Sequence, residues 1–398
     1  MYDVFNLPDI AFPAGFLWGS ATAAHQVEGD NVHSQRWADE QAGRIAVPSG
    51  KACDHYRRYR GDVALLARLG HGAYRMSVEW SRIEPENGRW DEAAADHYVD
   101  LLERLKNRGI RPFVTLHHVT HPLWFEKLGG FAGRGNLRYF ERFLERLVPR
   151  LSPFTDGWIV LNEFNLSTAP DSGPLKLAML RAHARGYHII KRHSKAPVGT
   201  AHAYIHWLPA RCHDPLDRVL ARYADFLTNE FFFHAVRTGE IVYPHTDAAY
   251  DREVKGSMDF WGVNYYHRQM ADARRAGLRG TPFRHTQLTL LREGPMAVRE
   301  LYPEGLIAAI ERLGDRPIYI TENGLPCEDD RFRIVSIALH LAALREAMDR
   351  GADVRGYFHW SLMDNYEWDS FAPRFGLVHV DFRTFQRTPK PSAYFYRD

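Results

Sequence analysis

Two glutamates, Glu163 and Glu322, have the type and the placement of catalytic acids. Glu163 directly follows the apolar run 158–162, and Glu322 directly follows the run 317–321. In parallel α/β barrels, the C-terminal tips of the strands carry the chemistry. Two carboxyl groups on separate strand tips are what acid–base hydrolysis of a glycosidic bond requires. Because the two glutamates lie far apart in the sequence, only the fold can bring them together.

Eight short apolar and aromatic runs predict the strands that would position these residues. The runs lack a clean alternation of polar and apolar residues, which is typical of strands covered on both faces in a parallel sheet. They are residues 16–20, 73–78, 112–117, 158–162, 198–203, 259–265, 318–321 and 355–360.

Helical patterns separate these runs, and the clearest covers residues 91–108. Asp91 can cap its N-terminus, Leu101 and Leu105 share one apolar face, and Gly109 follows as the stop. Similar apolar stripes predict further helices at 56–69, 137–151, 177–190, 216–236, 303–313 and 334–348.

This alternation of strand and helix predicts an α/β protein with a single (β/α)8 TIM barrel over residues 1–398. The last run has a natural neighbour in the first, which favours a closed barrel over an open doubly wound sheet. The first run is also not followed by the Gly-rich phosphate loop typical of dinucleotide-binding sheets. No linker rich in Pro, Gly or Ser divides the chain.

The composition is that of a globular protein without a strong charge preference. Of 398 residues, 45% are hydrophobic and 25% are charged, which is enough apolar material for a large core. The 51 basic and 49 acidic residues give a net charge of +2. No strong field therefore favours a nucleic acid or an anionic membrane as the partner.

The cysteines and the N-terminus indicate in which cellular compartment the protein is expected. Three widely spaced cysteines, Cys53, Cys212 and Cys327, do not form the pattern of a disulfide framework, and a reducing compartment fits them. The N-terminus lacks a positive n-region and an apolar h-region, and the chain has no apolar stretch of 18 residues. We therefore expect a soluble, cytoplasmic protein.

Polar and aromatic side chains follow each apolar run, so they are expected to converge on one rim of the barrel. A sugar-binding site needs this mixture, because hydroxyl groups need amide and carboxylate partners and the apolar ring face needs an aromatic surface. The residues are Gln26, Glu28, Glu79, Trp80, His117, His118, His121, Asn162, Glu163, His202, Tyr204, Asn264, Tyr265, Tyr266, Glu322, Asn323, Trp360, Glu367 and Trp368.

Several short motifs follow one another along the chain. Residues 17–29 read LWGSATAAHQVEG and residues 319–324 read YITENG. Further motifs lie at 74–83, 264–266, 360–368 and 374–377. Together they resemble, in the same order, the motifs of family 1 glycoside hydrolases, the β-glucosidase group. The resemblance extends over nearly the whole chain.

The resemblance implies a retaining β-glycosidase without a cofactor or a metal. It would hydrolyse the terminal non-reducing bond of unphosphorylated β-glucosides or related β-glycosides through a covalent glycosyl-enzyme intermediate. Glu322 would be the nucleophile, and Glu163 the general acid and then the general base. Glu322 must stay ionised, with Arg75 as a nearby cation, whereas desolvation and the field of Glu322 keep Glu163 protonated. The carboxyl groups should be about 5 to 5.5 Å apart.

The resemblance also implies substrate contacts. It assigns the surface of the glycone, the sugar that is transferred, to Trp360 and Trp368, and a hydrogen bond with the nucleophile to Tyr266. Asn264 would support the site. The acidic Glu367 argues for an unphosphorylated glycone, because it would repel a phosphate. The residues assigned to sugar hydroxyl groups are Gln26, His118, Asn162 and Glu367.

Three features depart from the family pattern. Phe164 follows the acid where the family has proline, so the backbone rigidity of that proline is absent. Val119 stands where a tryptophan is common, which removes a bulky wall beside His118. The segment 167–176 is short where the family often has a long loop. Together they predict a wider site for the leaving group.

Other functions fit parts of the same sequence. A catalytically silent sugar-binding protein could use the same scaffold, and a transglycosidase would share the same residues. A metal-dependent hydrolase could use His117, His118 and His121, because barrel hydrolases bind zinc through strand-tip histidines. However, His117 and His118 point to opposite faces of an extended strand, and no companion ligand set follows. We therefore expect no metal.

A basic stretch covers residues 267–286, with only Asp272 as an acidic residue. We interpret it as a solvated surface loop, and the alternative is a gate that favours acidic substrates. Cys327 is interpreted as a small packing residue. The basic residues are Arg268, Arg274, Arg275, Arg279 and Arg284.

Overall fold

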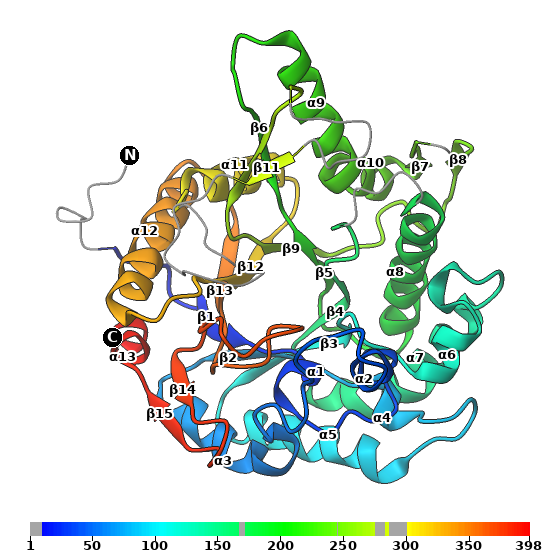
Figure 1. Ribbon diagram of the computed structural model, residues 1–398, viewed down its shortest axis with the longest axis vertical. Coiled ribbons are helices and arrows are strands. Elements are labelled where there is room, and N and C mark those ends of the chain that lie inside the picture. The colour runs from blue at the N-terminus through cyan, green and yellow to red at the C-terminus, as the bar shows by residue number, and fades with distance from the viewer. Residues whose placement is uncertain (1–9, 167–171, 245, 275–282, 286–300) are drawn as a thin grey trace.

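A closed barrel of eight parallel strands forms the centre of the computed structural model, which describes residues 10–166, 172–244, 246–274, 283–285 and 301–398 (Figure 1). All eight predicted strands, and with them the (β/α)8 barrel, are confirmed. In spatial order the strands are β1 (Leu17–Ala21), β13 (Val354–Trp360), β12 (Ile318–Asn323), β9 (Phe260–Asn264), β5 (Val198–Ala203), β4 (Gly157–Asn162), β3 (Arg111–His117) and β2 (Ala73–Ser77).

Helices surround the barrel and connect its strands (Figure 1). In α5 (Glu92–Lys106), Asp91 caps the N-terminus by accepting a hydrogen bond from the backbone N–H of Ala94 at 3.0 Å. Gly109 follows with a φ of +72°. The other confirmed helices are α3 (His55–Arg68), α7 (Leu137–Leu151), α8 (Gly173–His193), α11 (Glu304–Arg312) and α12 (Asp330–Asp349). Shorter helices are α1 (Ala24–Val27), α2 (Gln35–Gln41), α4 (Trp80–Ile83), α6 (Leu123–Lys127) and α13 (Pro391–Arg397).

The predicted helix over 216–236 is confirmed, but it contains a π-helical turn that was not predicted. The segment consists of α9 (Pro215–Asp225), a π-helical turn (Phe226–Glu230) and α10 (Phe231–Thr238). Within the π-helical turn, Asn229 Nδ2 donates to the carbonyl oxygen of Ile205 at 2.8 Å, and Asn229 Oδ1 lies 3.1 Å from Nε2 of His202. These tertiary contacts coincide with a local widening of the helix, and hydrophobic periodicity does not reveal them.

Three small sheets outside the barrel were not predicted, because their strands have only two to four residues. One of them changes the interpretation of the basic stretch, since 268–271 and 283–285 are strands and not loop. Arg268 lies over the ring of Tyr302 at 4.2 Å, whereas residues 275–282 lie outside the described residues. The sheets pair β6 (His206–Pro209) with β10 (Arg268–Ala271) and β11 (Phe283–His285), β7 (Glu240–Ile241) with β8 (Ala249–Tyr250), and β14 (Val378–Val380) with β15 (Arg387–Pro389).

The barrel closes where the first strand pairs with the last, β1 with β13. The C-terminal helix α13 covers this seam. The hydroxyl oxygen of Tyr396 lies 2.8 Å from the carbonyl oxygen of Gly19 in β1 and 3.1 Å from that of Tyr357 in β13. Residues near the two ends of the chain therefore hold the same junction.

Aromatic rings fill the barrel interior. The ring of Phe113 lies 5.0 Å from that of Phe358 and 5.2 Å from that of Tyr319, and Tyr319 in turn lies 4.9 Å from Phe260. The neighbouring position must be glycine, because a Cβ at Gly157 would approach the Phe113 ring to 2.4 Å. The interior is thus a packed core, and polar side chains gather at the strand tips. Within the described residues, no helix is both long and apolar enough to cross a membrane.

Candidate active site

The barrel brings Glu163 and Glu322 to neighbouring positions around Asn264. Glu163 directly follows β4, Glu322 lies near the end of β12, and Asn264 ends β9. Asn264 pairs in register with Glu322, and its Nδ2 donates to Oε1 of Glu163 at 2.9 Å. Thr321 Oγ1 donates to Oδ1 of Asn264 at 2.7 Å, which fixes the orientation of the amide. One amide therefore lies between the strands that carry the two carboxyl groups.

Glu322 is held by a cation and a phenol. Arg75 Nη1 lies 2.5 Å from Oε1 of Glu322, and the Tyr266 hydroxyl donates to Oε2 at 2.6 Å. Arg75 is fully buried, and its Nη2 also donates to Oδ1 of Asn162 at 2.6 Å. Its Nε donates to Thr115 at 3.2 Å. Because the buried guanidinium is bonded on several sides, the charge opposite Glu322 has a fixed position.

Glu163 has a different electrostatic environment. Desolvation raises the pKa of Glu163 to about 8, and the negative charge of Glu322 contributes to the increase. The hydrogen bond from Asn264 opposes the increase without cancelling it. The carboxyl group of Glu163 therefore holds a proton at neutral pH, whereas the carboxyl group of Glu322 is paired with the Arg75 guanidinium.

Glu367 forms a second acidic position with Gln26 and Trp360. Trp360 Nε1 donates to Oε1 of Glu367 at 3.1 Å, and Gln26 Nε2 donates to Oε2 at 3.1 Å. Burial raises the pKa of Glu367 to about 8. Gln26 is fully buried, yet its Oε1 has no hydrogen-bond partner among the described residues. A buried acceptor of this kind requires a partner from outside the chain or a bound water.

His118 offers a donor in the same region. Its ring stacks 6.0 Å from Trp360 and 6.0 Å from Trp368. Burial, together with the nearby Arg75, lowers the pKa of His118 well below its usual value, so the ring is neutral. Asn162 Nδ2 donates to Nε2 at 3.1 Å, which leaves the proton on Nδ1. This buried Nδ1 has no partner within the described part of the chain.

Two residues of α2 hold the loops around this region, and the sequence did not reveal them. Gln35 Nε2 donates to the carbonyl oxygen of Val119 at 3.1 Å, and Arg36 Nη2 donates to that of Trp368 at 2.6 Å. Val119 and Trp368 both have left-handed backbones, with φ of +67° and +63°. Gln35 and Arg36 belong to no recognisable motif, so only tertiary structure shows their contacts.

Two other predicted rim residues do not join the site. Glu28 pairs with Arg82 at 2.7 Å and accepts a hydrogen bond from Tyr98 at 2.9 Å. Glu79 accepts a hydrogen bond from Thr120 at 2.6 Å. Both carboxylates are therefore bonded to side chains of the protein itself.

His117 and His118 contact different parts of the protein, as expected for consecutive residues of a strand. His117 contacts His121 at 3.4 Å and packs edge-on against Phe131, whereas His118 contacts Asn162. The described residues contain no group of three His, Cys, Asp or Glu side chains arranged to hold a metal ion. The three histidines therefore do not form one site.

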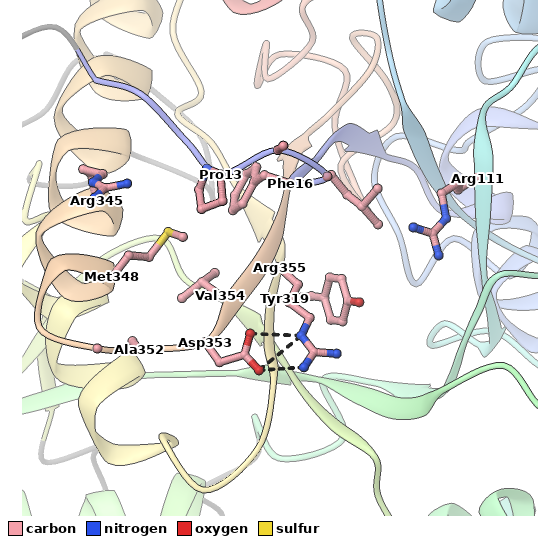
Figure 2. Close-up of a pocket in the computed structure, with 14 residues that line it drawn as sticks. Pro13, Phe16, Arg111, Tyr319, Arg345, Met348, Ala352, Asp353, Val354 and Arg355 are labelled. Carbon is pink, nitrogen blue, oxygen red and sulfur yellow. Dashed lines mark hydrogen bonds and ion pairs between the residues drawn. The ribbon is translucent and has the colours of Figure 1, made fainter.

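A cavity of about 610 Å³ lies at the opposite end of the barrel (Figure 2). Its lining comes from the starts of strands, including Leu17 of β1, Arg111 of β3 and Val354 of β13. Arg355 on its wall is paired with Asp353 at 2.8 Å. Since all barrel strands are parallel, this cavity and the two glutamates lie at different ends of the barrel.

Comparisons with known proteins agree with this geometry. The family model described as glycosyl hydrolase family 1 matches residues 9–398. Thermostable beta-glucosidase B of Thermobispora bispora is 33% identical, over 98% of this chain and 90% of the relative. A 6-phospho-beta-galactosidase of Staphylococcus epidermidis is 30% identical, over 97% of each protein. The structure of a beta-glycosidase from Pyrococcus horikoshii superposes with a TM-score of 0.87, at 36% identity, over 97% of this chain and 94% of that one.

The family model covers nearly the whole chain, and the sequence motifs, the closed barrel and the similar structures all lead to one family. The chain belongs to glycosyl hydrolase family 1, whose members are retaining glycosidases.

Proposed function

We propose that the protein hydrolyses the terminal non-reducing bond of unphosphorylated β-glucosides or related β-glycosides, with Glu322 as nucleophile and Glu163 as acid and base. The observation that carries this proposal is the pairing of Glu322 with Arg75 beside a Glu163 whose pKa is raised to about 8. Two carboxyl groups with opposite protonation are what a retaining mechanism needs. The names of the β-glucosidase and β-glycosidase relatives support the substrate class.

In the first step, a carboxylate oxygen of Glu322 attacks the anomeric carbon and Glu163 donates its proton to the glycosidic oxygen. The bond between these two substrate atoms breaks, the alcohol leaves, and a glycosyl ester forms on Glu322. Arg75 and Tyr266 hold the carboxylate in a fixed orientation for the attack.

In the second step, Glu163 removes a proton from a water molecule, and the resulting hydroxide attacks the anomeric carbon and releases Glu322. Esterification has by then removed the negative charge of Glu322, which is one of the causes of the raised pKa of Glu163. The pKa of Glu163 therefore falls in the intermediate, so the same group becomes able to act as the base.

The proposed glycone site uses two buried atoms that have no hydrogen-bond partner among the described residues. Oε1 of Gln26 would accept a hydrogen bond from a sugar hydroxyl group, and Nδ1–H of His118 would donate one. Glu367 and Asn162 would provide the remaining polar contacts, and Trp360 and Trp368 would provide the apolar surface for the sugar ring.

The raised pKa of Glu163 predicts a basic limb in the pH profile. The first step needs the protonated acid, so kcat/KM for a phenyl β-glycoside should be constant below pH 8 and fall about tenfold per pH unit above it. Measurement of kcat/KM between pH 6 and 10 tests this expectation. The Glu163→Gln variant should lack this decrease above pH 8. If the decrease persists in that variant, it arises from the titration of another group.

A panel of p-nitrophenyl glycosides tests the substrate class. Glu367 places an acidic group in the proposed glycone site, bonded to Trp360 and Gln26, and such a group disfavours an anionic 6-phosphate. We expect kcat/KM for β-glucoside or one of its epimers to exceed that for the 6-phosphorylated sugar by about 100-fold or more. A preference for the 6-phosphorylated sugar would contradict the proposal. Sugar binding without release above the Glu322→Gln background would indicate a silent sugar-binding protein.

A further inference from the structure

The backbone of Glu163 has an unusual conformation. Its φ is +48°, in the left-handed region that residues other than glycine rarely adopt. Such a conformation persists only when the surrounding structure enforces it. The next residue, Phe164, leaves its own φ unrestricted, whereas a proline there would fix it. Without a proline after the acid, the contacts of the neighbouring residues matter more for the conformation of this turn.

Asn165 provides such contacts. Its side chain is fully buried, and Nδ2 lies 2.8 Å from the carbonyl oxygens of both Ala203 and Thr228. Its Oδ1 accepts a hydrogen bond from the backbone N–H of Ala203 at 3.2 Å. Ala203 ends β5 and Thr228 lies in the π-helical turn. One side chain thus joins the turn after Glu163 to two other elements.

Further contacts of this turn reach β5 and α10, the helix that directly follows the π-helical turn. The backbone N–H of Glu163 donates to the carbonyl oxygen of Ala201 in β5 at 2.8 Å. The ring of Phe164 packs edge-on against Phe232 of α10, with centroids 5.2 Å apart and an interplanar angle of 87°. Phe164 contributes an apolar contact, whereas Asn165 contributes directional side-chain hydrogen bonds to both β5 and the π-helical turn.

We propose that Asn165 is a positioning residue for Glu163, which fixes the turn so that the acid meets the glycosidic oxygen. The inference rests on the proposed acid–base role of Glu163. The side chain of Asn165 is fully buried, so it would act on Glu163 through the backbone of the turn. In this chain the hydrogen bonds of Asn165 take the place of a rigid proline after the acid.

Asn165→Ala tests this role through its dependence on the leaving group. A phenol needs protonation to leave, whereas 2,4-dinitrophenolate does not. A displaced acid should lower kcat/KM for the phenyl β-glycoside by about 100-fold. For the 2,4-dinitrophenyl β-glycoside the loss should stay below about threefold. A residue with only a structural role would lower both values by the same factor.

Asn136→Ala is the matched control. The side chain of Asn136 is also buried, and its Nδ2 also donates to two backbone carbonyl oxygens, those of Leu128 and Gly130, both at 2.9 Å. Asn136→Ala should change kcat/KM for both substrates by the same factor or not at all. Asn165→Ser keeps one hydrogen-bonding group and should show a smaller but still selective loss. If Asn165→Ala does not fold, the losses of kcat/KM for the two leaving groups are compared in Asn165→Ser instead.

Equal losses for the two substrates in the folded Asn165 variants, or no loss, would overturn the inference. Glu163→Ala separates this result from a failure of the proposed function. If Glu163→Ala discriminates between the leaving groups and the Asn165 variants do not, only the positioning role is wrong. If Glu163→Ala does not discriminate either, the acid–base assignment itself is wrong.

Discussion

Glu322→Gln is expected to abolish the turnover of every glycoside, with a loss in kcat of roughly 10⁴-fold or more. The glutamine amide keeps the shape of the side chain, but it is a poor nucleophile and cannot form the glycosyl ester. The loss should be equally severe for activated substrates, because no leaving group removes the need for attack at the anomeric carbon. Release of 2,4-dinitrophenol measures the residual rate.

Glu126→Gln is a suitable control for this variant. Glu126 is paired with His121 at 2.9 Å and is not in contact with Arg75, Tyr266 or Asn264. It should therefore retain the activity of the unchanged protein. Thermal unfolding of both variants checks that they fold. Substantial hydrolysis by folded Glu322→Gln would remove Glu322 from the role of nucleophile.

Glu163→Ala is expected to separate substrates by their leaving groups. The loss in kcat/KM should be about 10³-fold for a phenyl β-glycoside, because general acid catalysis contributes roughly 10² to 10⁴ in rate. For a 2,4-dinitrophenyl β-glycoside the loss should be small. In the second step the variant lacks a base, so its glycosyl ester should accumulate, and added azide should restore turnover by attacking without base assistance.

The product identifies the face of the attack. Azide that enters the site left by the removed carboxyl group should yield a β-glycosyl azide, which nuclear magnetic resonance can distinguish from the α-anomer. Equal loss for both leaving groups, without a response to azide, would exclude Glu163 as the acid.

The barrel and its strand tips were predictable because their determinants are local. Each buried strand is an apolar run, and parallel strands place all their C-terminal residues at one rim. Arg75 was also expected near Glu322, although it lies at the centre of β2 and reaches Glu322 with its long side chain. The hydrogen bond between Tyr266 and Glu322 was expected from the family resemblance alone.

Other features depended on contacts that the sequence does not display. The apolar periodicity of the helix over 216–236 does not show the π-helical turn within it, where the side chain of Asn229 bonds with Ile205. Glu28 follows a barrel strand, as the residues of the candidate site do. However, its carboxylate is bonded to Arg82 and Tyr98. Arg36 and Asn165 bond to backbone carbonyl groups near the proposed substrate site. Every residue has such a carbonyl group, so the sequence does not show which one will be the partner.

The junction of β1 with β13 has a consequence for synthesis on the ribosome. Both glutamates emerge well before Trp360, Glu367 and the helix that carries Tyr396. A growing chain can thus contain the complete acid pair while the barrel is still open at its seam. The wall that would receive the sugar exists only after the last barrel strand has paired with the first, so activity should begin only after this pairing and not gradually before it.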